Sequence, residues 1–335
     1  MPERPFRWGI LSAANIARRR FVPGLQRGTE GVAAAVAARD ADRARAFASE
    51  LGIPRAYDSY DALLDDPEID GVYIGLPNAL HAEWTVRAAQ AGKHVLCEKP
   101  LARRAADVDR MAAACSDAGV LLMEAFMYRH HPQHARVKEL LAAGEIGEPA
   151  YLRATFSFAM DAARRSRDVR VRPDLDGGAF MDVGCYTLNA ARFLFDAEPI
   201  EVTALQRFDA GLGVDTTFAA VLRFPGDRLA VVDGSFDVGG PQRYEIVGDR
   251  GSIVVDPFVQ PGPAATSFTL VRGGERCLIE VAGVDQYALE ADHFVQSVRA
   301  DRLLPPAEDG RAQARAVEVL YRSAETGRAV RLQDG

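Results

Sequence analysis

The first 126 residues alternate between short apolar runs and segments of helical periodicity, and this alternation restricts the fold more than any other feature. The runs FRWGIL, VAAAVAA, GVYIGLP, HVLCEKP and VLLMEAF have the length and composition of buried strands. Several of the helical segments between them end in a glycine, which suits a helix C-cap. Strand, helix, strand, repeated about six times, predicts parallel strands with right-handed crossovers. We therefore expect an α/β, doubly wound Rossmann sheet over residues 1–126.

The pattern changes after residue 126, where long alternating stretches such as PAYLRATFSF and TTFAAVLRF are joined by turns rich in Gly and Asp. They predict an antiparallel or mixed sheet. Two helices, over about 286–300 and 308–327, follow it, and Pro305-Pro306 excludes helix between them. A chain of 335 residues suits two domains. We expect residues 127–335 to form an α+β domain with a large open, mostly antiparallel sheet for substrate binding and oligomerisation.

Charge and composition exclude several classes of partner. The net charge of −7 argues against nucleic acid and anionic membranes and favours a small-molecule substrate. The N-terminus lacks the apolar region of a signal peptide, and no apolar stretch approaches the ~20 residues of a membrane span. The four cysteines show no CxxC spacing, which predicts reduced thiols in a cytoplasmic protein.

The loop after the first apolar run, within WGILSAANIARRR, has the form of a dinucleotide-binding loop without its glycines. Ser12, Ala14 and Ala17 stand where GxGxxG would place glycine. Small residues before a helix N-terminus still suit a pyrophosphate, and a Ser hydroxyl can contact a phosphate oxygen. The alternative is an ordinary strand-to-helix turn. The candidate cofactor-binding residues here are Ser12, Ala13, Ala14, Asn15 and Ile16.

The end of the second apolar run concerns the choice of nucleotide. Ala38 stands where an acid would bind the ribose 2′-hydroxyl of NAD, and Arg39 and Arg43 follow it. Two guanidinium groups can hold a 2′-phosphate, which favours NADP over NAD. The alternatives are that both arginines are solvated, or that Asp40 serves the ribose and the cofactor is NAD.

Two further motifs end apolar runs at the edge where ligands bind in doubly wound sheets. LPNALH supplies the cofactor candidates Leu76, Pro77, Asn78 and His81, although Asn78 can instead cap a helix and His81 can pack. CEKP supplies Glu98 and Lys99. Two charges at a buried strand end are costly unless they are used or paired. Lys99 therefore suits contact with the nicotinamide ribose and the reacting hydroxyl, whereas the alternative is a Glu98–Lys99 surface pair.

The motif DGGAFMDVGCYTLN lies in the second half of the chain. Asp182 and Tyr186 are four residues apart and Asn189 follows three later, so a helix would place them on one face. A carboxylate and a phenol on one face suit proton transfer to a sugar hydroxyl. The alternative is a helix whose Tyr is half-buried core.

The segment RHHPQH contains His130, His131 and His134, but no Cys or acid stands at the spacing of a zinc ligand. We expect no metal site.

Together, EKP at the fifth apolar run and GGAFMDVGCY in the second half resemble the glucose–fructose oxidoreductase and inositol dehydrogenase (Gfo/Idh/MocA) family over nearly the whole chain. The resemblance implies an NAD(P)-dependent oxidoreductase of sugars, inositols or related polyols. It implies that Lys99 is the active-site lysine, Asp182 the substrate-orienting acid and Tyr186 the proton donor or acceptor. It also implies that Tyr287, in DQYALEADHF, borders the active site.

The Tyr186 variant of the motif resembles the sugar dehydrogenase, ketosugar reductase and dimeric dihydrodiol dehydrogenase branches. A Lys99 ammonium near the phenol would lower its pKa from ~10 and favour the phenolate. The alternatives are a trans-dihydrodiol dehydrogenase-like activity, a lyase or hydrolase that uses the nucleotide transiently, and a non-catalytic NADP-binding sensor. We expect a homodimer or homotetramer, because few helices are available to cover the second sheet.

Overall fold

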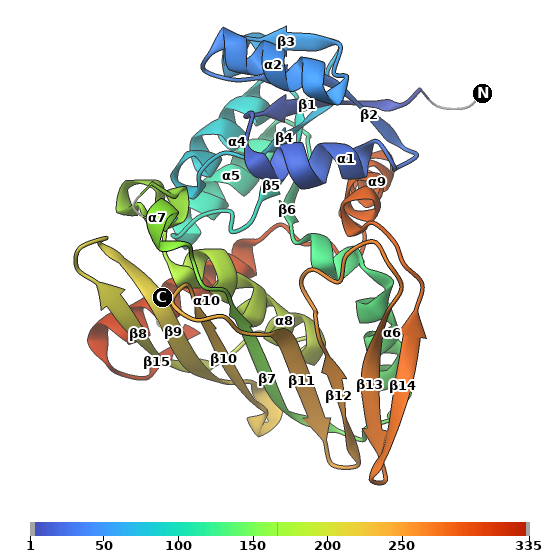
Figure 1. Ribbon diagram of the computed structural model, residues 1–335, viewed down its shortest axis with the longest axis vertical. Helices are drawn as coiled ribbons and strands as arrows, with labels where there is room; N and C mark the ends of the chain where they lie inside the picture. The colour runs from blue at the N-terminus through green and yellow to red at the C-terminus, as the bar shows by residue number, and fades with distance from the viewer. Residues whose placement is uncertain (1–3, 166, 333–335) are drawn as a thin grey trace. The chain divides into compact units, whose positions relative to one another are not determined.

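The computed structural model describes residues 4–165 and 167–332 (Figure 1). The chain forms two compact units. The first contains the residues up to Ala102 together with Ala106–His130 and Asp285–Arg311. The second contains Arg103–Ala105, His131–Val284 and the residues from Ala312 onward.

A six-stranded parallel sheet with the order β3-β2-β1-β4-β5-β6 forms the centre of the first unit. This is the strand order of a doubly wound dinucleotide-binding fold, as the alternation of apolar runs predicts. The strand β3 was not expected, because its three residues are only partly buried and form no apolar run. The strands are β1 Phe6–Leu11, β2 Gly31–Ala37, β3 Arg55–Tyr57, β4 Gly71–Ile74, β5 His94–Glu98 and β6 Leu122–Ala125.

The crossover segments of the first unit are short helices with recognisable ends. The helix α2 begins after Asp40, whose carboxylate accepts the N–H of Arg43, and ends at Gly52 with φ of 67°. Ser59 caps α3 in the same way through the N–H of Ala62. The helices are α1 Val22–Leu25, α2 Ala41–Leu51, α3 Tyr60–Leu64, α4 His81–Gln90 and α5 Ala105–Asp117.

The helix α9 (Gln286–Arg299) belongs to the first unit, although the sequence analysis places all of residues 127–335 in the second domain. Its apolar face packs on the core of the first unit, where the rings of Phe294 and Trp8 lie 5.0 Å apart. Gly24 of α1 approaches it so closely that a Cβ there would lie 2.5 Å from the Cβ of Tyr287. The boundary drawn from sequence is therefore wrong for residues 285–311, because helical periodicity does not show which core a helix covers.

The second unit is built on a nine-stranded sheet with the order β14-β13-β12-β11-β7-β10-β9-β8-β15. The strands β7 and β10 run parallel and the other neighbours are antiparallel, which confirms the expected mostly antiparallel sheet. The strands are β7 Pro149–Ser157, β8 Glu201–Asp209, β9 Val214–Arg223, β10 Leu229–Ser235, β11 Gln242–Gly248, β12 Gly251–Val255, β13 Thr266–Arg272, β14 Glu275–Val281 and β15 Val330–Arg331.

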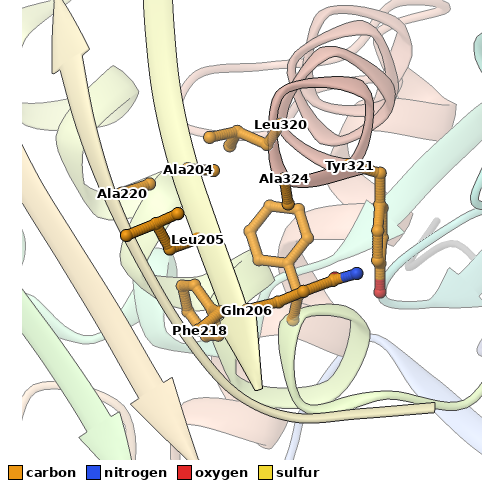
Figure 2. Close-up of a pocket in the computed structure, with 9 residues that line it drawn as sticks. Ala204, Leu205, Gln206, Phe218, Ala220, Leu320, Tyr321 and Ala324 are labelled. Carbon is orange, nitrogen blue, oxygen red and sulfur yellow. The ribbon is translucent and has the colours of Figure 1, made fainter. Parts of the chain in front are cut away.

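Helices cover one face of this sheet (Figure 1). They are α6 Pro132–Ala142, α8 Cys185–Phe195 and α10 Arg311–Thr326. Figure 2 shows a pocket where α10 faces β8 and β9, lined by Phe218, Leu320 and Tyr321 among others. Its volume is about 10 Å³, which is the space of a single water molecule, so it is a packing gap and not a substrate site. The opposite face of the sheet carries exposed apolar side chains, Leu205 and Val221 among them.

The helices of the described chain include none that is both long and apolar enough to cross a membrane. All four cysteines are free thiols, with Cys277 exposed and the other three buried.

Candidate active site

The loop after β1 makes a turn that glycine would favour. Ser12 has φ of 112°, and its N–H donates to the carbonyl of Ala37 at 3.0 Å. The carbonyl of Ala14 accepts the N–H of Arg18 at 3.0 Å, which begins a π-helical turn over Ala17–Phe21. The N–H groups of residues 15–17 therefore have no intrahelical acceptor. A helix start with such donors is suited to a phosphate anion.

The two arginines after β2 converge on one point of the first unit. Both Arg39 and Arg43 are exposed, and their positive charges act on the hydroxyl of Tyr60. Burial raises the pKa of Tyr60, and the two guanidinium groups oppose that rise. Asp40 is occupied as the cap of α2, because its Oδ1 accepts the N–H of Arg43 at 2.8 Å. The carboxylate of Asp40 is therefore used in capping α2, and the exposed cations beside it are Arg39 and Arg43.

His81 lies beneath the loops that follow β4 and β5. Its ring nitrogens contact the carbonyl oxygens of Leu76 at 2.8 Å and of Pro100 at 3.0 Å, and the residue has no exposed surface. Burial lowers its pKa, which favours the neutral ring. The structure therefore corrects the expectation that His81 contacts the cofactor, since its ring is used to join the two loops. Pro77 and Asn78, at the start of the 3₁₀ turn that precedes His81 in the chain, are half-buried.

Glu98, at the end of β5, is part of a buried group of acids and phenols. Its Oε1 accepts the hydroxyl of Tyr73 at 2.6 Å, and its Oε2 lies 3.3 Å from the N–H of Lys99. Burial and the Glu98 charge raise the pKa of Tyr287 and hold that of Glu290 well above its usual range. Tyr287 was expected here. Glu290, which is 1% exposed, was not expected here. A single acid in an amphipathic helix has the same sequence pattern as a solvated residue.

Asp182 and Tyr186 lie at the start of the helix that packs on the sheet of the second unit. Asp182 is in a π-helical turn over Phe180–Gly184, and Tyr186 is in the first turn of α8. Tyr186 is buried, with its ring 5.7 Å from that of Phe156. Asp182 is ion-paired with Arg170 at 2.8 Å.

Asn189, three residues after Tyr186 in α8, contacts another helix. It is fully buried, and its amide donates to the side chain of Gln313 at 3.3 Å. The π turn changes the angular spacing between Asp182 and the residues of α8, and Asn189 packs against α10.

Asp215 fixes the beginning of the π turn, a role that its sequence pattern does not predict. Its carboxylate accepts the N–H of Phe180 at 2.7 Å and the hydroxyl of Tyr321 at 3.0 Å. Burial raises its pKa, and these hydrogen bonds oppose the rise. Gly178 is required beside it, since a Cβ there would lie 2.3 Å from the Asp215 Oδ1.

The histidines of RHHPQH are used in packing and capping. His131 accepts the N–H of Gln133 and caps α6, while His134 contacts the hydroxyl of Tyr244 and the carbonyl of Phe258. Across residues 4–165 and 167–332, no group of three or more His, Cys, Asp and Glu side chains is placed to hold a metal ion.

Comparison with protein families agrees with this architecture. Residues 6–126 match the oxidoreductase family with an NAD-binding Rossmann fold, and residues 134–254 match the GFO/IDH/MocA C-terminal domain. The chain belongs to the Gfo/Idh/MocA oxidoreductase family. The resemblance drawn from EKP and GGAFMDVGCY is thereby confirmed, and the protein is an oxidoreductase.

The relatives compared below cover three quarters or more of this chain. D-xylose 1-dehydrogenase (NADP⁺) 2 of Haloferax volcanii is 42% identical, over 97% of this chain and 99% of its own. A trans-1,2-dihydrobenzene-1,2-diol dehydrogenase of Xenopus laevis is 35% identical over 76% of each chain. The crystal structure of a 3-ketoreductase of Actinomadura kijaniata, with NADP and TDP-benzene, is 31% identical with a TM-score of 0.88, covering 96% of this chain and 98% of its own.

Proposed function

We propose that this protein transfers hydride between NADP(H) and a carbinol or ketone carbon of a sugar or related polyol. The observation that carries the proposal is the full-length similarity to an NADP⁺-dependent xylose dehydrogenase. The ketoreductase that holds NADP has the same fold. NADP supplies the hydride acceptor or donor, and the protein binds, orients and moves a proton.

The first unit has the groups that a dinucleotide requires. The Ser12 turn and the helix start after Ala14 suit the pyrophosphate, and Arg39 with Arg43 suits the 2′-phosphate. The remaining candidates for the adenine and nicotinamide ends are residues beside the strand ends and on α9. They are Ala13, Asn15, Ile16, Leu76, Pro77, Asn78, Glu98, Lys99 and Tyr287.

Three side chains act on the substrate in this proposal. Lys99 donates to the reacting oxygen, Asp182 binds a neighbouring hydroxyl, and Tyr186 accepts the hydroxyl proton during oxidation and returns it during reduction. Burial of Tyr186 keeps its phenol out of bulk water. A non-catalytic NADP sensor could lose Lys99 or Tyr186, and this chain keeps both.

A second candidate is the oxidation of a trans-dihydrodiol, which the similarity to the Xenopus laevis enzyme supports. A dihydrodiol and a sugar share a pair of adjacent hydroxyl groups, so the same lysine, acid and phenol serve both. We further propose a cytoplasmic location, which suits the four free thiols.

The test is a panel of aldoses, 3-ketosugars and dihydrodiols with NADP⁺ or NADPH, followed by absorbance at the reduced-nicotinamide band. We expect turnover of at least one sugar or ketosugar. Turnover of the dihydrodiols alone would favour the second candidate. Nucleotide binding without turnover of any class would contradict both and indicate a sensor.

A further inference from the structure

The strand β14 forms one edge of the nine-stranded sheet, with no strand beyond it (Figure 1). It has seven residues, whereas the other edge strands among the described residues, β3, β6 and β15, have three, four and two. Its residues from Glu275 to Leu278 are all exposed. A long open edge presents backbone N–H and C=O groups to other chains, and folded proteins usually shorten or cover such edges. The exposed length of β14 therefore indicates a surface with which another strand can pair.

The hairpin that joins β13 to β14 determines which groups of β14 point outward. Arg272 pairs with Glu275 across a turn of two glycines, both with positive φ, as in a type I′ turn. Residues that flank such a turn exchange hydrogen bonds, so β14 bonds to β13 through Glu275 and every second residue after it. The intervening residues, Arg276, Leu278 and Glu280, therefore direct their N–H and C=O groups away from the sheet.

The side chains of these three residues form a row on one face of the strand. Leu278 in the middle is 65% exposed, and Arg276 and Glu280 on either side of it are exposed too. Across residues 4–165 and 167–332, neither of the two charged side chains forms a hydrogen bond or an ion pair. The row therefore presents a cation, an apolar group and an anion in that order, with both charges available to a partner.

This order is complementary to itself when two copies of the strand run antiparallel. With Leu278 opposite the same residue of the other copy, Arg276 of each strand faces Glu280 of the other, because both lie two residues from Leu278. Opposite charges directly across a ladder are stabilising, and like charges are destabilising. A shift of the register by two residues in either direction loses both charge pairs. A twofold axis at Leu278 generates the complementary register, and twofold contacts are the commonest in protein assemblies.

We propose that β14 binds β14 of a second copy of this chain, antiparallel and with the two Leu278 side chains facing each other. A second copy is the occupant, because it supplies the complementary charges in the required order. The strands that carry Leu205 and Val221, β8 and β9, lie toward the other end of the sheet, so this is a separate surface. One strand pair is small beside the ~1,600 Å² of a standard interface, so we expect it to be weak by itself and to join copies that a larger contact holds. The inference does not depend on the proposed oxidoreductase function.

The first experiment is a disulfide cross-link in the full chain. Leu278→Cys is made in a Cys277→Ser background, in which the other three cysteines are buried. Residues directly opposite each other at a hydrogen-bonded position have Cα atoms about 5.5 Å apart, which a disulfide can span. Thr269→Cys in the same background is the matched control, because Thr269 pairs with Leu278 within the chain on the same face. Two copies of Thr269 would be three strand spacings apart, about 14 Å.

We expect Leu278→Cys to form a disulfide-linked dimer at least about tenfold faster than Thr269→Cys, since only the first pair is within bonding range. Non-reducing electrophoresis after mild oxidation measures both rates. Equal rates for the two variants, or no dimer from Leu278→Cys, would overturn the inference.

The second experiment exchanges the charges in the Leu278→Cys protein. Arg276→Glu and Glu280→Arg each place like charges opposite each other at two positions, so each should slow cross-linking by about tenfold or more. The double variant restores opposite charges and should recover the rate to within about threefold of the parent. The two residues lie about 13 Å apart along one strand, so a contact within the chain cannot produce this rescue.

Melting temperatures of all variants show whether the chain stays folded. Single charge variants that cross-link as fast as the parent would contradict the proposed register, and so would a folded double variant that is as slow as either single one. Nucleotide-dependent turnover should be the same in every β14 variant, and its absence from the wild-type protein would contradict the proposed function alone.

Discussion

Tyr186 shows at the scale of one residue how burial and chemistry combine. The phenol is almost fully buried against Phe156 on the sheet of the second unit, and it follows the acid Asp182 by four residues. In the structure the ring is part of the core, as the alternative interpretation held, and this does not prevent its hydroxyl from reacting. Only a substitution that keeps the ring separates the two roles.

Tyr186→Phe should lower kcat by about 10²- to 10⁴-fold, which is the usual contribution of a proton-transfer group. The dissociation constant of NADP should change little, because the dinucleotide candidates lie in the first unit. Stopped-flow hydride transfer and nucleotide titration measure the two effects. If the variant keeps more than about a third of the wild-type rate when chemistry limits turnover, Tyr186 has only a packing role.

Glu290 should make the stability of the protein depend on pH. Burial and the Glu98 charge raise the pKa of Glu290 in the folded state, so the folded protein holds a proton that the unfolded chain releases above about pH 4.3. The free energy of unfolding therefore falls as pH rises from that value toward the raised pKa. Glu290→Gln removes this dependence and should raise the melting temperature more at pH 8 than at pH 5. An equal change in melting temperature at pH 5 and pH 8 would show that Glu290 is ionised in the folded protein.

At the scale of one element, we expect the junction of β2 and α2 to decide which nucleotide is bound. Asp40 caps the helix, and Arg39 and Arg43 remain as the charges near the Tyr60 hydroxyl. NADP should bind about tenfold or more tightly than NAD, from one good charge-assisted contact. Arg39→Ala should narrow the difference in affinity between NADP and NAD. Calorimetric titration with each nucleotide measures the two dissociation constants. Equal or tighter NAD binding by the wild-type protein would exclude a 2′-phosphate site here.

The π-helical turn that carries Asp182 should depend on Asp215. Asp215→Ala leaves the Phe180 N–H and the Tyr321 hydroxyl without their acceptor, in a buried place. Each unsatisfied group costs about 1–3 kcal/mol, so we expect a loss of about 2–4 kcal/mol in the free energy of unfolding. Tyr321→Phe removes one of the two bonds and should cost about 1 kcal/mol. Urea denaturation measures both, and a loss no larger for Asp215→Ala than for Tyr321→Phe would contradict this role.

At the scale of the whole molecule, the uncovered face of the second sheet predicts self-association. Leu205 on β8 and Val221 on β9 are 68% and 46% exposed on the face opposite the helices. Apolar side chains grouped in this way are typical of an interface. Light scattering should give at least twice the monomer mass of 36.3 kDa at micromolar concentration. Leu205→Asp with Val221→Asp should return the monomer, and a monomeric wild-type protein would contradict the prediction.

The sequence by itself determined the parallel sheet, the antiparallel sheet, the family and the position of the candidate groups at strand ends. The two sheets and the strand ends follow from local periodicity, which depends only on residues close together in the chain. The family follows from its resemblance in the motifs EKP and GGAFMDVGCY. The tertiary structure decided which groups are free to act. His81 was expected at the cofactor and lies beneath two loops, and α9 was expected in the second domain and packs on Trp8 of the first.

Glu290, Asp215 and Arg170 were absent from the sequence prediction for the same reason. Each takes its role from a partner far away in the chain or across a loop, such as Glu98 for Glu290 and the Phe180 N–H for Asp215. An acid or an arginine in a polar stretch has the same local pattern whether it is solvated or buried beside a partner. Burial in a low-dielectric interior is what changes its proton affinity and its hydrogen bonding, and burial is decided only when distant segments pack together.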